Sequence, residues 1–337
     1  MIDVFLGFAF LASATVANKY VLKVLSLSLV VGLRMLGAGI ILFFYYRRKS
    51  HRLSFNYFKK DIWMLLGISL LTMLIPALFK AFALKYMYAS KAAFLASLDP
   101  FVTALYSVFF WHERLTQKKI IGIILGFSGT LILLASSGQN EMIVWSIFSY
   151  PEISALLAMS IGRLGWMFVQ QVLRKETYTA PEINGLLMSL SGILAFVMPF
   201  LLALGRALVG LTLFDTLLPS YTFTDATSFL QIIPSTGIST PFIFIVLIYS
   251  IVIGNVVGYT MYANFLKHHS ATFVSLAGFS VPLYVYLFSA VLLKEPLSLN
   301  FLAASVVTFV GLLIFYQDEI KTLHTAQWHL FKNTKNS

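Results

Sequence analysis

The sequence predicts an all-α polytopic membrane protein with ten transmembrane helices arranged as a 5+5 inverted repeat. Three observations support this prediction: the composition, ten long apolar runs and an internal repeat. Of the 337 residues, 59% are hydrophobic and 11% are charged, and the mean hydropathy is +0.85. A soluble domain needs more polar residues than this to cover its surface. The chain has no cysteine, which excludes disulfides and thiolate chemistry.

Ten apolar runs have the length of a membrane-spanning helix. A helix of about 20 residues crosses the hydrocarbon core, which is about 30 Å thick. The first run is predicted to be a retained helix, since no basic stretch precedes it and no clear small-residue cleavage site follows. The runs cover residues 4–22, 27–46, 61–84, 89–111, 118–137, 152–173, 183–204, 241–265, 271–293 and 299–316.

Basic residues concentrate in the loops on one side of these runs. With the N-terminus inside, the outer loops hold only Lys23, Lys85, Arg206 and Lys294. The positive-inside rule therefore places both termini in the cytoplasm, in a cell (inner) membrane. It also accounts for the net charge of +11 without a nucleic-acid partner. The inner loops and tail hold Arg47, Arg48, Lys49, Arg52, Lys59, Lys60, Arg114, Lys118, Lys119, Arg174, Lys175, Lys267, Lys321, Lys332 and Lys335.

The two halves of the chain repeat each other at a separation of 182 residues. The segment 84–132 aligns without a gap, and the scarce residues match: Pro100 with Pro282, and Glu113 with Glu295. Five helices per repeat is an odd number, so the second half inserts upside down, as in many secondary transporters. The predicted units are a first repeat (1–138), a second repeat (152–317) with a long outer loop (205–240), and a cytoplasmic tail (318–337).

Several of these segments resemble a known family. They are "ALKYMYASKAAFLASLDPFVTALYSVFFWHERLT", "GIILGFSGTLILL" and the second-half segments "LLKEPLS" and "FVGLLIF". Together with Arg34 in "VGLRMLGAGIILF", they are similar to the drug/metabolite transporter superfamily, in particular its EamA-type ten-helix members. The resemblance covers nearly the whole chain, although the Trp-Gly pair frequent in the family's first helix is absent. It implies a 5+5 inverted-repeat transporter of small metabolites and does not name the metabolite.

The matched prolines and glutamates are predicted to have structural roles. Pro100 and Pro282 lie well inside their runs, where proline removes a backbone hydrogen bond and bends the helix. We interpret them as hinges beside the transport pathway, with packing kinks as the alternative. Glu113 and Glu295 lie at helix ends, where capping or pairing with a basic residue is expected rather than proton transport.

Charged residues inside the runs indicate the binding site. A charge at the bilayer centre costs about 2.5–3.5 kcal/mol on insertion scales, so such residues usually have a partner or a function. Arg34 is expected to pair with Asp99, and Lys19 and Lys91 to lie at the outer mouth. Arg163 and Lys80 are expected to hold the substrate's charged group. The predicted substrate-binding residues, several at helical spacing on shared faces, are Lys19, Lys80, Lys91, Arg163, Trp166, Gln170, Asn255, Tyr259 and Tyr262.

Five basic residues against the single acid Asp99 predict an anionic substrate, phosphorylated or carboxylated. The alternative within transport is an amino acid or a cationic or aromatic drug-like compound, which tyrosine and tryptophan rings would suit. A non-transporting membrane sensor or assembly subunit is the alternative from another class. No enzyme is predicted, because no HExxH, nucleotide-binding loop or metal-ligand cluster occurs. We expect no cofactor and no metal, and leave a homodimer open.

Overall fold

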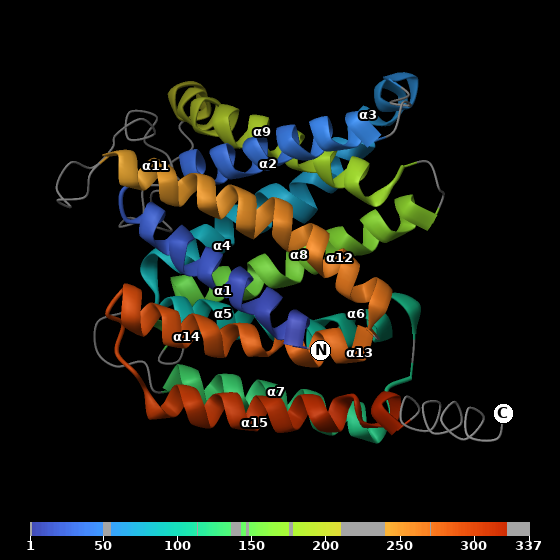
Figure 1. Ribbon diagram of the computed structural model, residues 1–337, viewed down its shortest axis with the longest axis vertical. Helices are drawn as coiled ribbons and strands as arrows, with labels where there is room; N and C mark the ends of the chain where they lie inside the picture. Colours follow the sequence, from blue (N-terminus) through green and yellow to red (C-terminus); the bar gives the residue numbers. More distant parts are fainter. Residues whose placement is uncertain are drawn as a thin grey trace.

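The computed structural model is a bundle of membrane-length helices (Figure 1). It describes residues 2–49, 55–112, 114–135, 143–145, 148–174, 178–209, 240–269 and 271–321. Glu113, residues 210–239 of the long outer loop and the tail after residue 321 lie outside the described residues, as does the side chain of Tyr259.

The first half contains five predicted spans. The first two are α1 (Ile2–Leu22) and α2 (Leu27–Lys49). The third comprises α3 (Phe55–Ser69), a π-helical segment η1 (Leu70–Leu74) and α4 (Ile75–Tyr86). The fourth comprises α5 (Ala89–Ala96) and α6 (Asp99–Trp111), and the fifth is α7 (Gln117–Ala135).

The second half begins after a short antiparallel hairpin of β1 (Ile143–Trp145) and β2 (Phe148–Ser149). Its first two helices are α8 (Tyr150–Arg174) and α9 (Ala180–Val209). The next span comprises α11 (Thr240–Tyr249), a π-helical segment η3 (Ser250–Val257) and α12 (Gly258–His268). The last two spans comprise α13 (Ala271–Gly278) with α14 (Ser280–Leu292), and α15 (Leu299–Phe315).

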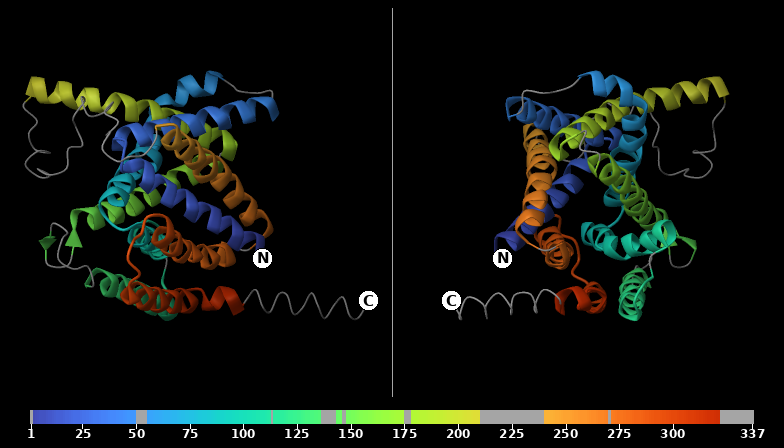
Figure 2. Two further views of the ribbon diagram at one scale, coloured as in Figure 1. Left: turned by 60° about the vertical axis from the view of Figure 1, so that its left-hand side comes forward. Right: turned by 90° about the vertical axis from the view of Figure 1, so that its right-hand side faces the viewer.

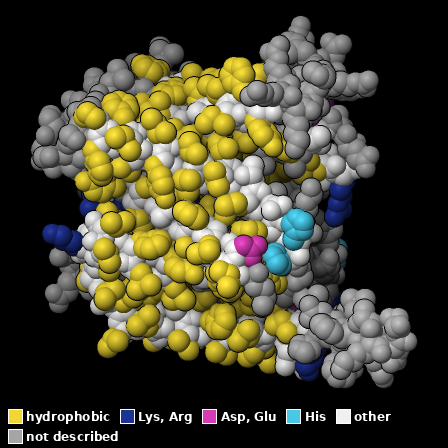
Figure 3. All heavy atoms as spheres, viewed as in Figure 1, with side chains coloured by type: hydrophobic (Ala, Val, Ile, Leu, Met, Phe, Trp, Pro, Cys, Tyr) yellow, Lys and Arg dark blue, Asp and Glu magenta, His cyan; other side chains and the backbone are white. Residues whose placement is uncertain are grey.

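The surface supports the membrane prediction. Within the described residues, nine helical stretches are long and apolar enough to cross a bilayer, and Leu299–Phe315 is a shorter apolar helix. Figure 3 shows one face covered with apolar side chains, while Lys and Arg appear at its left and right edges. The prediction of an all-α polytopic membrane protein is therefore confirmed, apart from the small hairpin.

The third and eighth spans share an irregularity that the sequence did not reveal. Each changes from α-helix to π-helix near its middle, at η1 and at η3. The repeat offset of 182 places Thr72 of η1 at the position of Gly254 in η3. Such π turns are rare and often occur at functional sites.

The fourth and ninth spans are each broken at their proline. Pro100 is the second residue of α6, after an interruption at Ser97–Leu98, and Pro282 is the third residue of α14, after an interruption at Phe279. A break rather than a bend follows because proline fits the first turn of a helix, where its missing N–H is not needed. Whether the breaks act as hinges stays a prediction.

Helices with the same position in the two halves pack against each other. α2 contacts α9, α7 contacts α15 and α5 contacts α14, while α1 packs on η3 and α12 as α8 packs on η1 and α4. The α7–α15 contact is close: a Cβ atom at Gly122 would lie 2.7 Å from the carbonyl oxygen of Gly311. This is the arrangement that an inverted repeat predicts, and the repeat itself stays a prediction.

The two ends of the bundle are distinct. In both views of Figure 2, the start of α1 and the end of α15 lie on one side, and the β1–β2 hairpin lies on the other. We name these ends the termini end and the hairpin end. By the charge bias of the loops, the termini end is predicted to be cytoplasmic.

Candidate functional site

A cavity of about 320 Å³ lies in the middle of the bundle. Helices α1, α2, α4, α5, α6 and α8 line it, together with both π-helical segments. Its charged lining residues are Arg34, Lys80, Asp99 and Arg163. Its neutral polar lining includes Thr15, Asn18, Thr72, Trp166 and Asn255, and three methionines, Met35, Met73 and Met159, add apolar surface that adapts readily.

The break in the fourth span positions Asp99. As the first residue of α6, Asp99 lies at the positive end of the helix dipole, which favours a carboxylate there. An Nη1 atom of Arg163 lies 3.4 Å from its Oδ2 atom. Both side chains keep open surface, 28% for Arg163 and 42% for Asp99, so this pair remains accessible from the cavity.

The π-helical segment η3 positions a second polar contact. Asn255 is buried in η3, and its Oδ1 atom accepts a hydrogen bond of 2.7 Å from Nη2 of Arg34. Gly254 beside it allows η3 to pack closely on α1, since a Cβ there would lie 3.2 Å from the Cβ of Ala14. Arg34, predicted to pair with Asp99, thus donates to Asn255, and the carboxylate of Asp99 has Arg163 as its partner instead.

Lys80 differs from the other cations in the cavity. It follows η1 on α4, lines the cavity and is solvent-exposed by its surface area. It forms no ion pair or hydrogen bond with any residue that the structure describes. Three basic residues against one acidic residue leave the described cavity lining with an excess of two positive charges.

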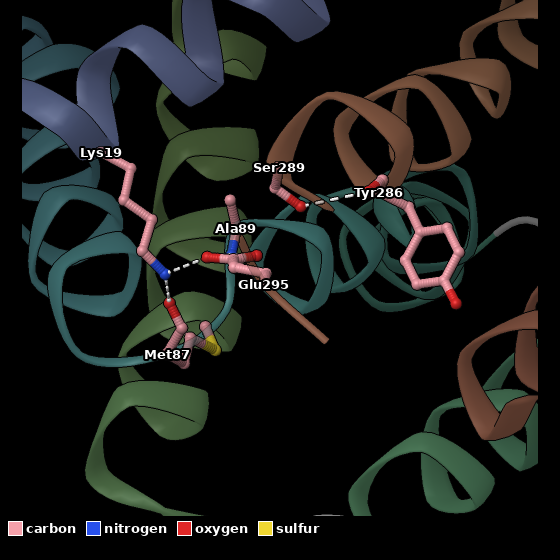
Figure 4. Close-up of polar contacts among 6 residues, drawn as sticks. All are labelled: Lys19, Met87, Ala89, Tyr286, Ser289 and Glu295. Atoms are coloured by element: carbon pink, nitrogen blue, oxygen red, sulfur yellow. Dashed lines mark hydrogen bonds and ion pairs between the residues drawn. The ribbon is translucent and has the colours of Figure 1, made fainter. Parts of the chain in front are cut away.

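Lys19 and Lys91 occupy a different environment from the predicted one. Figure 4 shows Lys19 pointing toward Glu295, with Nζ 2.5 Å from Oε1 and 2.5 Å from the carbonyl oxygen of Met87. Lys91 pairs with Glu152 of α8, and both are buried. Neither lysine lines the cavity. Neither lysine is exposed at the mouth of the cavity, because each pairs with a glutamate. Glu295 lies outside the predicted spans, and Glu152 lies in the first turn of one.

The predicted charge imbalance is therefore smaller than five to one. Glu295 and Glu152 neutralise two of the five lysines and arginines, and Asp99 neutralises a third. Glu295 also caps α5, because both of its carboxylate oxygens accept from the N–H of Ala89, at 3.1 and 3.0 Å. The structure shows both the capping and the pairing contacts expected for Glu295.

Four of the nine predicted substrate-binding residues line the cavity: Lys80, Arg163, Trp166 and Asn255. Gln170 is exposed and lies one turn beyond the cavity on α8. Tyr262 is 44% exposed and also lies outside the lining. The spacing that grouped it with Asn255 assumed regular α-helix, and η3 separates the two faces by its wider turns.

Sequence reasoning missed Asn18, Thr72 and Glu152. Asn18 and Thr72 are common residue types that stand out only once the cavity is known. Glu152 did carry a signal, since it is an acidic residue at the start of an apolar run. A search for an acid to match Lys91 could have found it.

Comparisons with known proteins agree with this architecture. Residues 1–135 match the model of the EamA-like transporter family. This match and the named relatives identify the chain as a transporter that is similar to the EamA-like family. A similar protein of Chlamydia muridarum, 24% identical over 94% of this chain and 92% of its own length, is named an S-adenosylmethionine/S-adenosylhomocysteine transporter. A Salmonella typhimurium protein, 25% identical over 76% of this chain and 77% of its own, is named a probable amino-acid metabolite efflux pump.

One solved structure has the same fold, with a TM-score of 0.57 over 93% of each chain at 14% identity. The family and the relatives are transporters rather than enzymes. The transporter described here is therefore a multi-pass membrane protein, and its relatives imply a small-molecule substrate.

Proposed function

We propose that this EamA-like protein is a secondary transporter for a small metabolite that carries a carboxylate or phosphate group. The observation that carries the proposal is the positive excess of the central cavity, with Lys80 lacking an acidic partner among the described residues. In a low-dielectric site an uncompensated charge is costly, and an anionic group of the substrate would offset that cost.

The lining suggests how such a substrate is held. The guanidinium of Arg163 can present two N–H groups to a carboxylate or phosphate, and the ammonium of Lys80 adds a point charge. Trp166 offers a flat apolar surface next to Arg163 on the same helix. Asn255 holds the Arg34 side chain at its Nη2 atom and so fixes the third positive group.

Alternating access would move the cavity between the two ends of the bundle. The breaks at Pro100 and Pro282 are the proposed hinges, because broken helices permit rigid pieces to rotate. The proposed mode of transport is exchange or facilitated flow rather than proton coupling. Asp99 is already engaged in an ion pair with Arg163, which does not suit a proton carrier.

A second candidate is a substrate of the amino-acid type, as in the relatives named for S-adenosylmethionine and S-adenosylhomocysteine. Asp99 is the observation in its favour, since its exposed carboxylate faces the cavity and can accept an ammonium group. Such compounds also carry a carboxylate for Arg163 or Lys80. The two candidates therefore share the anionic contact and differ in the use made of Asp99.

A binding screen tests the proposal. The thermal unfolding midpoint of the purified protein would be measured with sugar phosphates, nucleotides, dicarboxylates, amino acids, S-adenosylmethionine and S-adenosylhomocysteine. Transport of the ligands that raise it most would then be measured in liposomes. Arg163→Gln should weaken binding by about ten-fold, or about 1.4 kcal/mol, and Lys85→Gln, the same kind of change outside the cavity, should not. Preference for purely cationic ligands, unaffected by Arg163→Gln, would overturn the proposal.

Asp99→Asn separates the two candidates. If the substrate has an ammonium group at Asp99, this substitution should weaken its binding while leaving simple phosphates and dicarboxylates bound as well or better. If the substrate is only anionic, Asp99→Asn should strengthen binding, because it removes the one acidic group from the described lining.

A further inference from the structure

The Lys19–Glu295 cluster joins two groups of helices at the hairpin end. Lys19 is on α1, and Glu295 follows α14, which packs against α1. Their common neighbour is the turn between α4 and α5, where α4 packs mainly against α8 and α5 contacts both α8 and α14. Figure 4 shows the two charged side chains converging on this turn at Met87 and Ala89.

The contacts across this boundary match the polarity of the two helix ends. Lys19 donates from Nζ to the carbonyl oxygen of Met87, directly after the C-terminus of α4. Glu295 accepts from the N–H of Ala89, the first residue of α5. An ammonium group at a helix C-terminus and a carboxylate at a helix N-terminus both complement the helix dipole. Each member of the ion pair thus holds one helix end, in addition to holding the other member.

The cluster lies next to part of the cavity lining. Asn18, Leu84 and Ala92 line the cavity, and Lys19, Met87 and Ala89 are close neighbours of these residues in sequence. Lys91 and Glu152, beside the same turn, brace α5 against the start of α8, directly after the β1–β2 hairpin. At the termini end, α6 and α12 make no substantial helix–helix contact within the described residues.

We propose that Lys19 and Glu295 form a latch that closes the cavity at the hairpin end and must release for the cavity to open there. The latch acts by holding the α4–α5 turn of one helix group against α1 and α14 of the other. It assigns Lys19 a gating role, in place of the substrate contact that the sequence suggested. The inference rests on the proposed alternating access, and its test needs no substrate.

The absence of cysteine from the sequence makes the test direct. Ala96→Cys places a single thiol in the cavity lining, at an exposed position. A membrane-impermeant anionic methanethiosulfonate reagent is added to sealed vesicles, and the labelling rate is measured from each side. A separate Ser149→Cys variant in β2 identifies which side carries the hairpin.

In this background, Lys19→Met should raise the labelling rate from the hairpin side at least ten-fold. Glu295→Gln should raise it less, because an amide oxygen still accepts from Ala89 N–H. Lys85→Met is the matched control, since Lys85 is a lysine on the last turn of α4 outside the cluster, and it should leave the rate unchanged.

The exchanged pair Lys19→Glu with Glu295→Lys separates a latch on helix ends from a simple ion pair. It keeps the opposite charges but sets a carboxylate against the Met87 carbonyl, so labelling should stay fast. Restoration of the parent rate would overturn the helix-end mechanism. If Lys19→Met folds and is labelled at the parent rate, the latch is overturned. If Lys19→Met does not fold, a parent-like labelling rate in Glu295→Gln overturns it. A failed substrate screen would leave these rates unaffected, so the two proposals fail separately.

Discussion

The charged residues near the hairpin end and those in the central cavity have the same chemistry but opposite surroundings. Side chains of Lys19 and Glu295 are 9% and 8% exposed, and those of Lys91 and Glu152 are 5% and 2% exposed. In the cavity, Arg163 and Asp99 keep much more open surface and meet at 3.4 Å. The charges near the hairpin end are buried in contact with one another, whereas those in the cavity are accessible and can exchange a partner for a ligand.

A charge within a membrane span is therefore not by itself a sign of a binding site. A buried pair with complete contacts is costly to break, whereas an accessible group or a loose pair is free to respond to a ligand. Partner and exposure, rather than residue type, distinguish the two roles. Four measurements test this distinction.

The largest effect is expected at the Lys91–Glu152 pair. Lys91→Met leaves the carboxylate of Glu152 buried without this partner, and breaking such a pair typically costs about 3–5 kcal/mol of folding free energy. Thermal unfolding in detergent should show a clear fall in midpoint. The double variant Lys91→Met with Glu152→Met should recover most of the lost stability. If Lys91→Met alone is as stable as the parent, Lys91 belongs with the accessible charges of the cavity instead.

Lys80→Met should affect ligand binding and spare stability. Lys80 has no ion pair or hydrogen bond with the described residues, so its removal costs the folded state nothing and can raise the unfolding midpoint. Binding of the anionic ligand found in the screen should weaken by about ten-fold, or about 1.4 kcal/mol. Calorimetric titration and thermal unfolding on the same sample test both halves, and a large loss of stability would contradict the comparison.

A several-fold effect is expected from Asn255→Asp. The new carboxylate would pair with Arg34 through the present contact and reduce the positive excess of the described lining from two charges to one. Anion affinity should fall, while the fold keeps the hydrogen bond. Asn255→Leu serves as the comparison, because it breaks the contact without adding charge. Stronger anion binding in Asn255→Asp would argue against a role for the cavity charge.

The smallest effect is expected at Lys118. It pairs with Asp318 at the termini end, where the two side chains are 40% and 49% exposed. Exposed ion pairs contribute about 0–1 kcal/mol, and added salt screens them further. Lys118→Met should therefore leave both unfolding midpoint and transport close to the parent values. A loss comparable with that of Lys91→Met would show that exposure does not separate the two sets.

Much of the fold could be predicted from the sequence because the bilayer restricts the choices. Apolar runs of membrane length permit only helices, and the ten predicted segments recur as helices with small shifts of their ends. The irregularities were harder to predict. Pro100 and Pro282 marked the two broken spans, but no residue type marks a π turn such as Leu70–Leu74.

The site was predicted only in part, for a physical reason. Residues such as Arg163 and Trp166 on the long regular helix α8 keep the helical spacing that the sequence displays. The partners of Lys19 and Lys91 lie 276 and 61 residues away, so no local pattern reveals them. Whether a lysine is available to a substrate depends on such distant partners.

The π turns also make the orientation of the cavity residues depend on the number of residues in the span. A π-helical turn accommodates one residue more than an α-helical turn, and each residue of an α-helix rotates the face by about 100°. Deleting one residue within Leu70–Leu74 would convert this part of the span into regular α-helix. It would also rotate the residues on one side of the deletion relative to those on the other side. Pro76 and Lys80 would then face away from the cavity, with every side chain unchanged. For this transporter, the length of a five-residue segment is as informative as its composition.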